Sequence, residues 1–259
     1  MTCSHPKRVV CLSAEAVEIL YEIGCSRRLV GVTGYATQPP AARRKPRVSG
    51  FSKVHYDRVD ALRPDLIITF SDVQAAAAQE LIRRGHTVLA TNQRSLADIY
   101  ATICLLGQTM GRPAQAGKLI QQLRQEIERP HPPRKSRPKV YFEEWNEPFI
   151  SGIRWVSELI EAAGGEDIFS ELRTRSRASD RVVTSDEIIH RQPDLIMASW
   201  CGKKVKVKKI CQRPGWQNIP AIRHGRIYEI PSAHILQPGP SLLKGFRELR
   251  RIIEKWNGS

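Results

Sequence analysis

Five aromatic side chains stand where the sequence predicts that strands end, and together they could hold a flat ligand by stacking. They are Tyr35, Phe51, Phe70, Trp145 and Trp200. Aromatic residues make up only 7% of the chain, so their gathering at these positions is selective. Apolar rings combined with a few polar groups are typical of sites for large, partly apolar ligands. This pattern indicates a binding site for such a ligand.

Three polar side chains accompany the rings, namely Asp72, Lys203 and His234. Asp72 lies in the segment 70–74 that follows a predicted central strand. In the run 200–204, Trp200 could lie against the ligand and Lys203 on a ligand anion, or the run could be a solvated turn. His234 could bind a metal axially or donate to a phosphate, and a plain hydrogen-bond donor is the alternative.

No pattern in the chain predicts catalysis or a metal site. The carboxylates of Glu143, Glu144 and Glu147 lack a neighbouring His or Cys pattern, so we interpret them as solvated or paired with Arg154. None of the six cysteines forms a CxxC pair, and the histidines lack metal-ligand spacing. Motifs for nucleotide binding or a serine hydrolase are also missing. We therefore expect a non-enzymatic protein without a cofactor.

A repeated β/α pattern positions these candidate residues. The phrase Pro64-Asp65 precedes the apolar run 66–70, and Pro193-Asp194 precedes the apolar run 195–199. Each run predicts a strand buried on both faces of a sheet, and each aspartate is interpreted as part of the turn before it. Strands that alternate with helices predict parallel sheets, whose ligands bind beyond the carboxyl ends of the strands.

One helix separates the two copies of this pattern. Residues 113–128 begin with proline and carry an apolar stripe at helical spacing, and prolines follow at 130, 132 and 133. We predict an N-terminal α/β lobe (1–112), a spine helix with its linker (113–138) and a C-terminal α/β lobe (139–259). The predicted fold class is α/β: two lobes with parallel-type sheets, joined by one long helix, with a ligand cleft between the lobes.

The composition limits the possible partners and locations. A net charge of +15 favours anionic partners, but no nucleic-acid motif accompanies the basic clusters, so nucleic acid is not expected. The chain has no run of about 18 apolar residues, which predicts no transmembrane helix. It also shows no signal peptide, so we expect a cytoplasmic monomer for the chain as given, and export only if a signal has been left out.

Several motifs in order resemble one known family. They are the start 8–18, the loop from Gly34-Tyr35 to Pro39-Pro40, the segments 62–67 and 149–152, the run 164–169 and the second Pro-Asp phrase at 193–196. The chain resembles the cobalamin and iron-chelate class of ABC-transporter substrate-binding proteins, and most of all its vitamin B12-binding members. This resemblance implies two α/β lobes on a long helix, a corrinoid held between them by aromatic loops, and an ABC permease as partner.

The resemblance also implies roles for single residues. Tyr35 and Phe51 carry over as ligand contacts, and Trp145 and His234 lie in loops that match the family's binding loops. Phe51 and His234 stand where close relatives place tryptophan. Asp57 matches an acid that docks to the permease, and no acid matches at 236–237.

Two alternatives to a corrinoid carrier stay open. One is a protein that binds an iron chelate or haem, which the positive charge and the lysines after Trp200 would suit. The other is a cytoplasmic protein that stores, senses or modifies a tetrapyrrole or a chelated metal.

Overall fold

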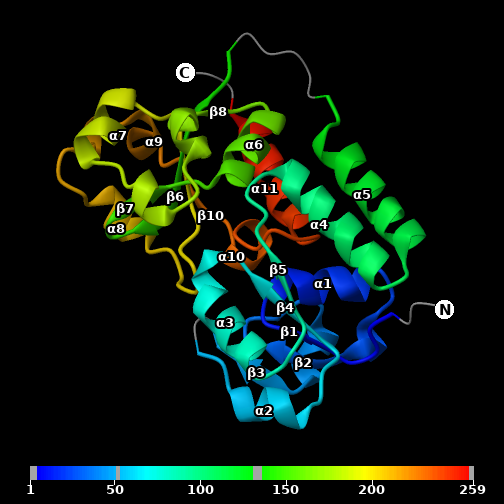
Figure 1. Cartoon of the computed structure of the whole chain (residues 1–259). Coiled ribbons are helices and arrows are strands. Elements are labelled where there is room, and N and C mark those ends of the chain that lie inside the picture. The colour runs from blue at the N-terminus through cyan, green and yellow to red at the C-terminus, as the bar shows by residue number, and fades with distance from the viewer. Residues whose placement is uncertain (1–4, 51–52, 131–135, 257–259) are drawn as a thin grey trace. The chain divides into compact units, whose positions relative to one another are not determined.

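Figure 1 shows the computed structural model of the chain, which describes residues 5–50, 53–130 and 136–256. The chain divides into two compact units. Unit 1 comprises Met1–Leu123 and Pro238–Ser241, and unit 2 comprises Arg124–Gln237 and Leu242–Ser259. The helix α5 (Pro113–Ile127) begins in unit 1 and ends in unit 2, which confirms the helix predicted for 113–128.

Unit 1 contains a five-stranded sheet in the order β3-β2-β1-β4-β5, and every neighbouring pair is parallel. Its strands are β1 (Val9–Cys11), β2 (Leu29–Thr33), β3 (Arg47–Ser49), β4 (Leu66–Phe70) and β5 (Val88–Thr91). The central strands are apolar and buried, as the run 66–70 predicted for a sheet covered on both faces.

Four helices cover the sheet of unit 1. They are α1 (Ala14–Glu22), α2 (Tyr56–Ala61), α3 (Ala75–Arg83) and α4 (Leu96–Thr109). Val59 of α2 and Leu81 of α3 pack in one cluster with Val10, Leu12 and Ile67 of the sheet, so α2 and α3 share a face. The crossovers from β1 to β2 and from β4 to β5 run in opposite directions, and right-handed connections therefore place α1 on the other face.

The two repeated aspartates have the structural role that the sequence predicted. The carboxylate of Asp65 accepts hydrogen bonds from the backbone nitrogens of Lys7 at 2.7 Å and Arg8 at 3.0 Å. In unit 2, Asp194 accepts one from the backbone nitrogen of Lys139 at 2.8 Å. Each aspartate thus ties the turn before a central strand to the start of the neighbouring strand.

Unit 2 contains a mixed sheet in which parallel pairs dominate. Its strands are β6 (Lys139–Asn146), β7 (Phe149–Ser151), β8 (Glu166–Asp167), β9 (Leu195–Ala198) and β10 (Ile227–Glu229). The order is β10-β9-β6-β7, with β8 also paired to β6; the β6–β7 pair is antiparallel, and the β6–β8, β6–β9 and β9–β10 pairs are parallel.

The β6–β7 hairpin, at residues 143–148, corrects the expectation that Trp145 lies in a loop. β6 continues through these residues to Asn146, and the chain then turns back as β7. The three glutamates and one proline favoured a loop. Cross-strand pairs such as Trp145 opposite Ile150 and Asn146 opposite Phe149 give the hairpin side-chain contacts that a local pattern does not reveal.

The helices of unit 2 are α6 (Arg154–Ala162), α7 (Ser185–Arg191), α8 (Val207–Cys211), α9 (Pro220–Arg223), α10 (Ser232–Ile235) and α11 (Leu242–Lys255). Of these, α7, α8 and α9 contribute residues to a buried cluster rich in aromatic rings. The buried ring of Tyr141 meets Phe169 at 5.9 Å and Trp216 at 6.2 Å between centroids, both edge to face. Thr184 and Glu187 form a capping box at the start of α7.

Within the described residues, no helix is both long and apolar enough to cross a membrane.

Candidate functional site

In unit 1, Tyr35 follows β2 at the carboxyl edge of the sheet and is the most accessible of those predicted aromatic contacts that the structure describes. Its side chain is 46% exposed, and its backbone nitrogen donates to Thr33 Oγ1 at 3.4 Å. Phe51 lies outside the described residues, so its predicted contact stays a prediction. The partly exposed Tyr35 ring thus lies at the edge where parallel sheets bind ligands.

Phe70 and Asp72 are joined by an arginine that the sequence reasoning missed. The guanidinium of Arg94 lies 5.8 Å from the centroid of Phe70, and its Nη2 is 2.8 Å from Asp72 Oδ1. Partial burial raises the pKa of Asp72, but the charge and hydrogen bond of Arg94 outweigh that effect and lower it. Asp72 is therefore a paired carboxylate that keeps its charge at neutral pH.

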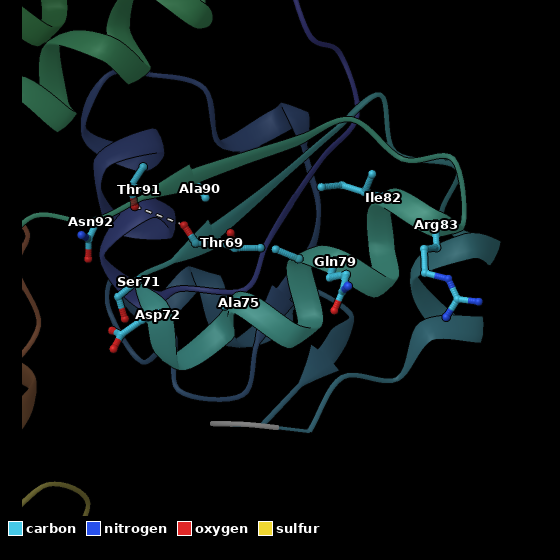
Figure 2. A pocket seen from close by; sticks show the side chains of 11 residues that line it. Thr69, Ser71, Asp72, Ala75, Gln79, Ile82, Arg83, Ala90, Thr91 and Asn92 are labelled. Carbon is cyan, nitrogen blue, oxygen red and sulfur yellow. Dashed lines mark hydrogen bonds between the residues drawn. The ribbon is translucent and has the colours of Figure 1, made fainter. Parts of the chain in front are cut away.

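Asp72 also lines a pocket of about 560 Å³ that residues of α3, β5 and the loops at their ends form within unit 1. Figure 2 shows the polar side chains of Ser71, Asp72 and Asn92 at one end of this pocket and Ile82 and Arg83 at the other. The hydroxyl of Thr91 donates to the Thr69 carbonyl at 3.2 Å, which joins β5 to β4 beside the pocket.

Two further carboxylates of unit 1 are buried on α1, and neither was singled out from the sequence. Glu15 is 4% exposed, its Oε1 lacks a hydrogen-bond partner among the described atoms, and burial raises its pKa to about 7. Glu18 accepts hydrogen bonds from the backbone nitrogen of Ser241 at 3.0 Å and from the Ser241 hydroxyl. Glu18 therefore ties the segment 238–241 to α1.

Asp57, the predicted permease contact, is fully exposed on α2. Arg84 Nη1 lies 3.5 Å from it, and the same guanidinium contacts Asp60 at 2.7 Å and Glu80 at 3.0 Å. Arg84 also covers the ring of Tyr56 at 4.8 Å. Tyr56, Asp57 and Arg84 line a pocket of about 450 Å³ on unit 1. Asp57 is accessible, as a docking residue must be, while its docking role stays a prediction.

In unit 2, the structure brings together Trp145 and Lys203, which are 58 residues apart in the sequence. Trp145 lies near the end of β6 and is half-buried. The Nζ atom of Lys203 stands 4.3 Å from its ring centroid, and the indole nitrogen donates to the Glu147 carbonyl at 2.9 Å. A cation over an indole face is a favourable pair, and it places a positive charge at the carboxyl edge of this sheet.

Trp200 lies in the core of unit 2 and not at an accessible edge. Its side chain is 4% exposed and belongs to the same buried cluster as Tyr141 and Trp216. Its indole nitrogen donates to Glu143 Oε1 at 2.9 Å. The ring is thus occupied by core packing, and the interpretation that Trp200 lies against a ligand gains no support from this position.

Glu143 and Arg213 form a buried ion pair, which corrects the prediction that Glu143 is solvated or paired with Arg154. Glu143 is 0% exposed and accepts two hydrogen bonds from the Arg213 guanidinium, at 2.6 and 2.9 Å. The hydroxyl of Tyr141 donates to the same carboxylate at 3.3 Å, and burial raises the pKa of Tyr141, with the charge of Glu143 adding to the effect.

The guanidinium of Arg213 also fills a space between two aromatic rings. It lies 4.5 Å from the centroids of both Phe149 and Trp216. Arg213 therefore connects the β6–β7 hairpin to the core of unit 2. Its ion pair with Glu143 and its stacking on the two rings both require the guanidinium to lie at this position.

Glu144 forms a second pair, also missed from the sequence. Its carboxylate accepts hydrogen bonds from the Arg181 guanidinium at 2.8 and 3.1 Å, and from the backbone nitrogen of Ile153 at 3.1 Å. Arg181 is 1% exposed. Arg154 instead pairs with Glu158, one helical turn further along α6, at 2.7 Å. Adjacent glutamates of one strand thus point to opposite faces and find different arginines.

His234 lies in the short helix α10 and not in a loop, and it is half-buried. Burial lowers its pKa, and the nearby charge of Lys244 adds to this effect. Its imidazole is therefore neutral at pH 7, with one nitrogen free to accept and one to donate. Within residues 5–50, 53–130 and 136–256, no group of three or more His, Cys, Asp or Glu side chains is placed to hold a metal ion.

Comparisons with known proteins agree on one family. A family model described as periplasmic binding protein matches residues 9–234. The chain is 27% identical to an uncharacterized ABC transporter substrate-binding lipoprotein, YvrC, of Bacillus subtilis, covering 96% of this chain and 80% of the relative. It is also 27% identical to a vitamin B12-binding protein of Vibrio parahaemolyticus, covering 96% of this chain and 90% of that protein.

A solved structure shows the same fold. The crystal structure of a possible iron-binding (periplasmic solute-binding) protein from Staphylococcus epidermidis superimposes with a TM-score of 0.84. It covers 97% of this chain and 100% of the other, at 21% sequence identity.

Proposed function

This chain belongs to the periplasmic binding protein family, and from that membership we propose that it binds a corrinoid such as cobalamin for an ABC importer. Its relatives include a vitamin B12-binding protein and a substrate-binding lipoprotein of an ABC transporter. The proposed role is non-enzymatic: the chain holds a ligand and does not change it chemically.

The Trp145–Lys203 pair is the observation that carries the choice of ligand. The indole offers an apolar face, and Lys203 places a cation 4.3 Å from it. Among the described residues, Lys203 forms no ion pair with a carboxylate. A corrinoid with its phosphate-containing tail presents both a flat apolar ring and an anion, which this pair would match. We propose Trp145, Lys203 and the exposed Tyr35 as ligand contacts.

The other candidate residues have weaker claims to direct contact. Phe70 and Asp72 are already held by Arg94, so we propose that they support the edge of unit 1. His234, neutral at pH 7, is proposed as a hydrogen-bonding group. Trp200 is proposed as a residue that orients Glu143.

A second candidate ligand is an anionic iron chelate. The net charge of +15 and the cation of Lys203 would suit such a ligand, and the superimposed Staphylococcus structure is described as that of a possible iron-binding protein. Haem, which combines a flat ring with two carboxylates, belongs to the same class of candidates.

Titration of the purified protein with cyanocobalamin, cobinamide, haemin and ferric citrate tests these proposals. All five tryptophans lie in unit 2, so quenching of tryptophan fluorescence reports on that unit, and calorimetry gives the affinity independently. We expect cyanocobalamin to bind, and we expect Trp145→Ala to weaken binding by roughly tenfold or more. Trp256→Ala, which removes an indole after α11, is the matched control.

The outcomes separate the candidates. If haemin or ferric citrate binds and the corrinoids do not, the proposed ligand becomes an iron chelate. If none of the four ligands binds, the chain has kept the family fold for another ligand, and the corrinoid proposal is wrong. An equal loss of affinity in the Trp145 and Trp256 variants would remove Trp145 from the proposed contacts.

The importer itself is tested through Asp57 and through location. We propose that Asp57 contacts a permease, so Asp57→Asn should reduce ligand uptake by cells while leaving ligand affinity in solution unchanged. The alternative of another class is a cytoplasmic protein that stores, senses or modifies a chelated metal. Recovery of the protein solely from the cytosol during cell fractionation would support that alternative.

A further inference from the structure

Four lysines form a separate basic surface on unit 2, which we call the α8 lysine patch. They are Lys204, Lys206, Lys208 and Lys209, and all four are exposed. Among the described residues, no ion pair joins any of them to a carboxylate. The patch is thus a concentration of uncompensated positive charge within six positions of the chain.

Two apolar anchors hold this segment against the core of unit 2. Val205 and Ile210 are buried in the cluster that contains Trp200 and Trp216. The backbone nitrogen of Val205 also donates to Glu229 Oε1 at 3.1 Å. These contacts fix the backbone at both ends of the patch, so the lysines project from an ordered surface.

An exposed apolar side chain lies in the middle of the patch. Val207 begins α8 between Lys206 and Lys208, and its side chain is 38% exposed. The exposed surface of the segment 204–209 therefore combines charged lysines with one apolar side chain, Val207, that is not buried in the core.

Three arginines of the chain show the contrast with these lysines. Arg84, Arg181 and Arg213 each contact one or more carboxylates and leave little charge uncompensated. The patch differs from these three positions because, among the described residues, its four charges have no carboxylate partner and lie within six positions of the chain.

We propose that the α8 lysine patch docks the protein on an anionic lipid surface. Clusters of four or more Lys or Arg residues are attracted to negatively charged headgroups, and each lysine near the surface adds about a factor of five in binding. Val207 would enter the interface between headgroups and acyl chains, while flexible lysine stems reach the phosphates. The proposal does not depend on which ligand the protein carries.

A lipid surface fits the patch better than a nucleic acid does. Nucleic-acid sites typically combine arginine forks or stacking aromatic rings with their positive charge. The segment 204–209 contains neither, and it contains an exposed valine that a polyphosphate would not require.

Cosedimentation with lipid vesicles tests the proposal on the full-length chain. We expect binding to vesicles of equal parts phosphatidylglycerol and phosphatidylcholine, and none to pure phosphatidylcholine. The triple variant K206Q/K208Q/K209Q should bind the mixed vesicles on the order of 100-fold more weakly. The single variant Val207→Ser should also weaken vesicle binding and leave any binding to single-stranded DNA unchanged.

A matched control separates the patch from the net charge of the chain. The variant R43Q/R44Q/K45Q removes three positive charges from the end of the 3-10 helix Pro40–Arg44 of unit 1 and gives the same net charge. We expect it to keep most of the vesicle binding, and circular dichroism confirms that each variant is folded. An equal loss in both triple variants would overturn the proposal in favour of diffuse attraction. Lysine-dependent binding to DNA without binding to vesicles would overturn it in favour of a nucleic acid.

Discussion

Replacing Arg213 with methionine should destabilise unit 2 more than any other surface-accessible arginine change in that unit. The guanidinium is 12% exposed, it bonds both oxygens of Glu143, and it lies between Phe149 and Trp216. Methionine keeps an unbranched side chain of similar reach and leaves Glu143, which is 0% exposed, without its opposite charge. The variant therefore isolates the effect of an unpaired buried carboxylate.

The expected loss is about 3 kcal/mol in the free energy of unfolding. Removing one partner of a buried ion pair costs roughly 3–5 kcal/mol, because the remaining charge stays away from water. Two features favour the lower end of this range. Trp200 and Tyr141 still donate hydrogen bonds to Glu143, and the methionine sulfur retains favourable contacts with the two aromatic rings.

Urea denaturation followed by tryptophan fluorescence measures this loss in the relevant unit. Because all five tryptophans lie in unit 2, the fluorescence transition is not mixed with the unfolding of unit 1. At a slope of about 2 kcal/mol per molar urea, the midpoint should fall by about 1.5 M. A matched exposed change, Arg175→Met, should shift the midpoint by less than about 0.3 M.

A second substitution tests the physical reason. The double variant Glu143→Gln/Arg213→Met removes both charges while glutamine still accepts from Trp200, so it should be more stable than Arg213→Met alone by at least about 1 kcal/mol. The reasoning is refuted if Arg213→Met costs less than about 1 kcal/mol. It is refuted equally if removal of the Glu143 charge restores nothing.

Three further predictions concern single positions. Burial raises the pKa of Glu15 from 4.5 to about 7, because the folded protein favours its neutral carboxyl. The contribution of this carboxyl to the stability of unit 1 is therefore complete below pH 4.5 and is lost as the pH rises through 7. Glu15→Gln should therefore stabilise unit 1 by about 3 kcal/mol at pH 8 and not at pH 4, measured by hydrogen exchange in α1. Gly31→Ala should lower the free energy of unfolding by about 1–3 kcal/mol, since the new Cβ would lie 2.7 Å from Leu62 Cδ1. Gly117→Ala meets open space and should stabilise α5 by up to about 1 kcal/mol. Thermal melting compares the two variants. Thr184→Ala removes the capping box of α7 and should lower the stability of unit 2 by about 1 kcal/mol in the fluorescence assay.

The strands and helices of this chain were largely predictable because their signals are local. The helix predicted at 113–128 is observed as Pro113–Ile127, and the strand predicted at 66–70 is observed at the same residues. Apolar spacing, a proline at a helix start and the prolines after its end act within a few residues of the backbone that they shape. The capping boxes at Ser95 and Thr184 are local in the same way, because each joins a Ser or Thr to an acid three residues later.

Side-chain partners in the candidate site were not predictable in the same way. Glu143 was expected to meet Arg154 or water, yet its partner Arg213 lies 70 residues away in the sequence. Glu144 pairs with Arg181 across 37 residues, and Lys203 lies over the ring of Trp145 across 58 residues. A charge pattern read along the chain favours near neighbours, whereas these pairs depend on which strands and loops pack together.

The sequence by itself determined the α/β class, the two-fold repetition of the Pro-Asp phrase, the long helix and the candidate rings at strand ends. Hydrophobic periodicity and turn chemistry are sufficient for these features because each depends on neighbouring residues. Only the tertiary structure decided that Tyr35 is exposed, that Trp200 is buried, and that Glu143 and Glu144 hold two arginines. Burial and ion pairing depend on contacts between distant segments, and in a low-dielectric interior those contacts fix where each charge and each ring must lie.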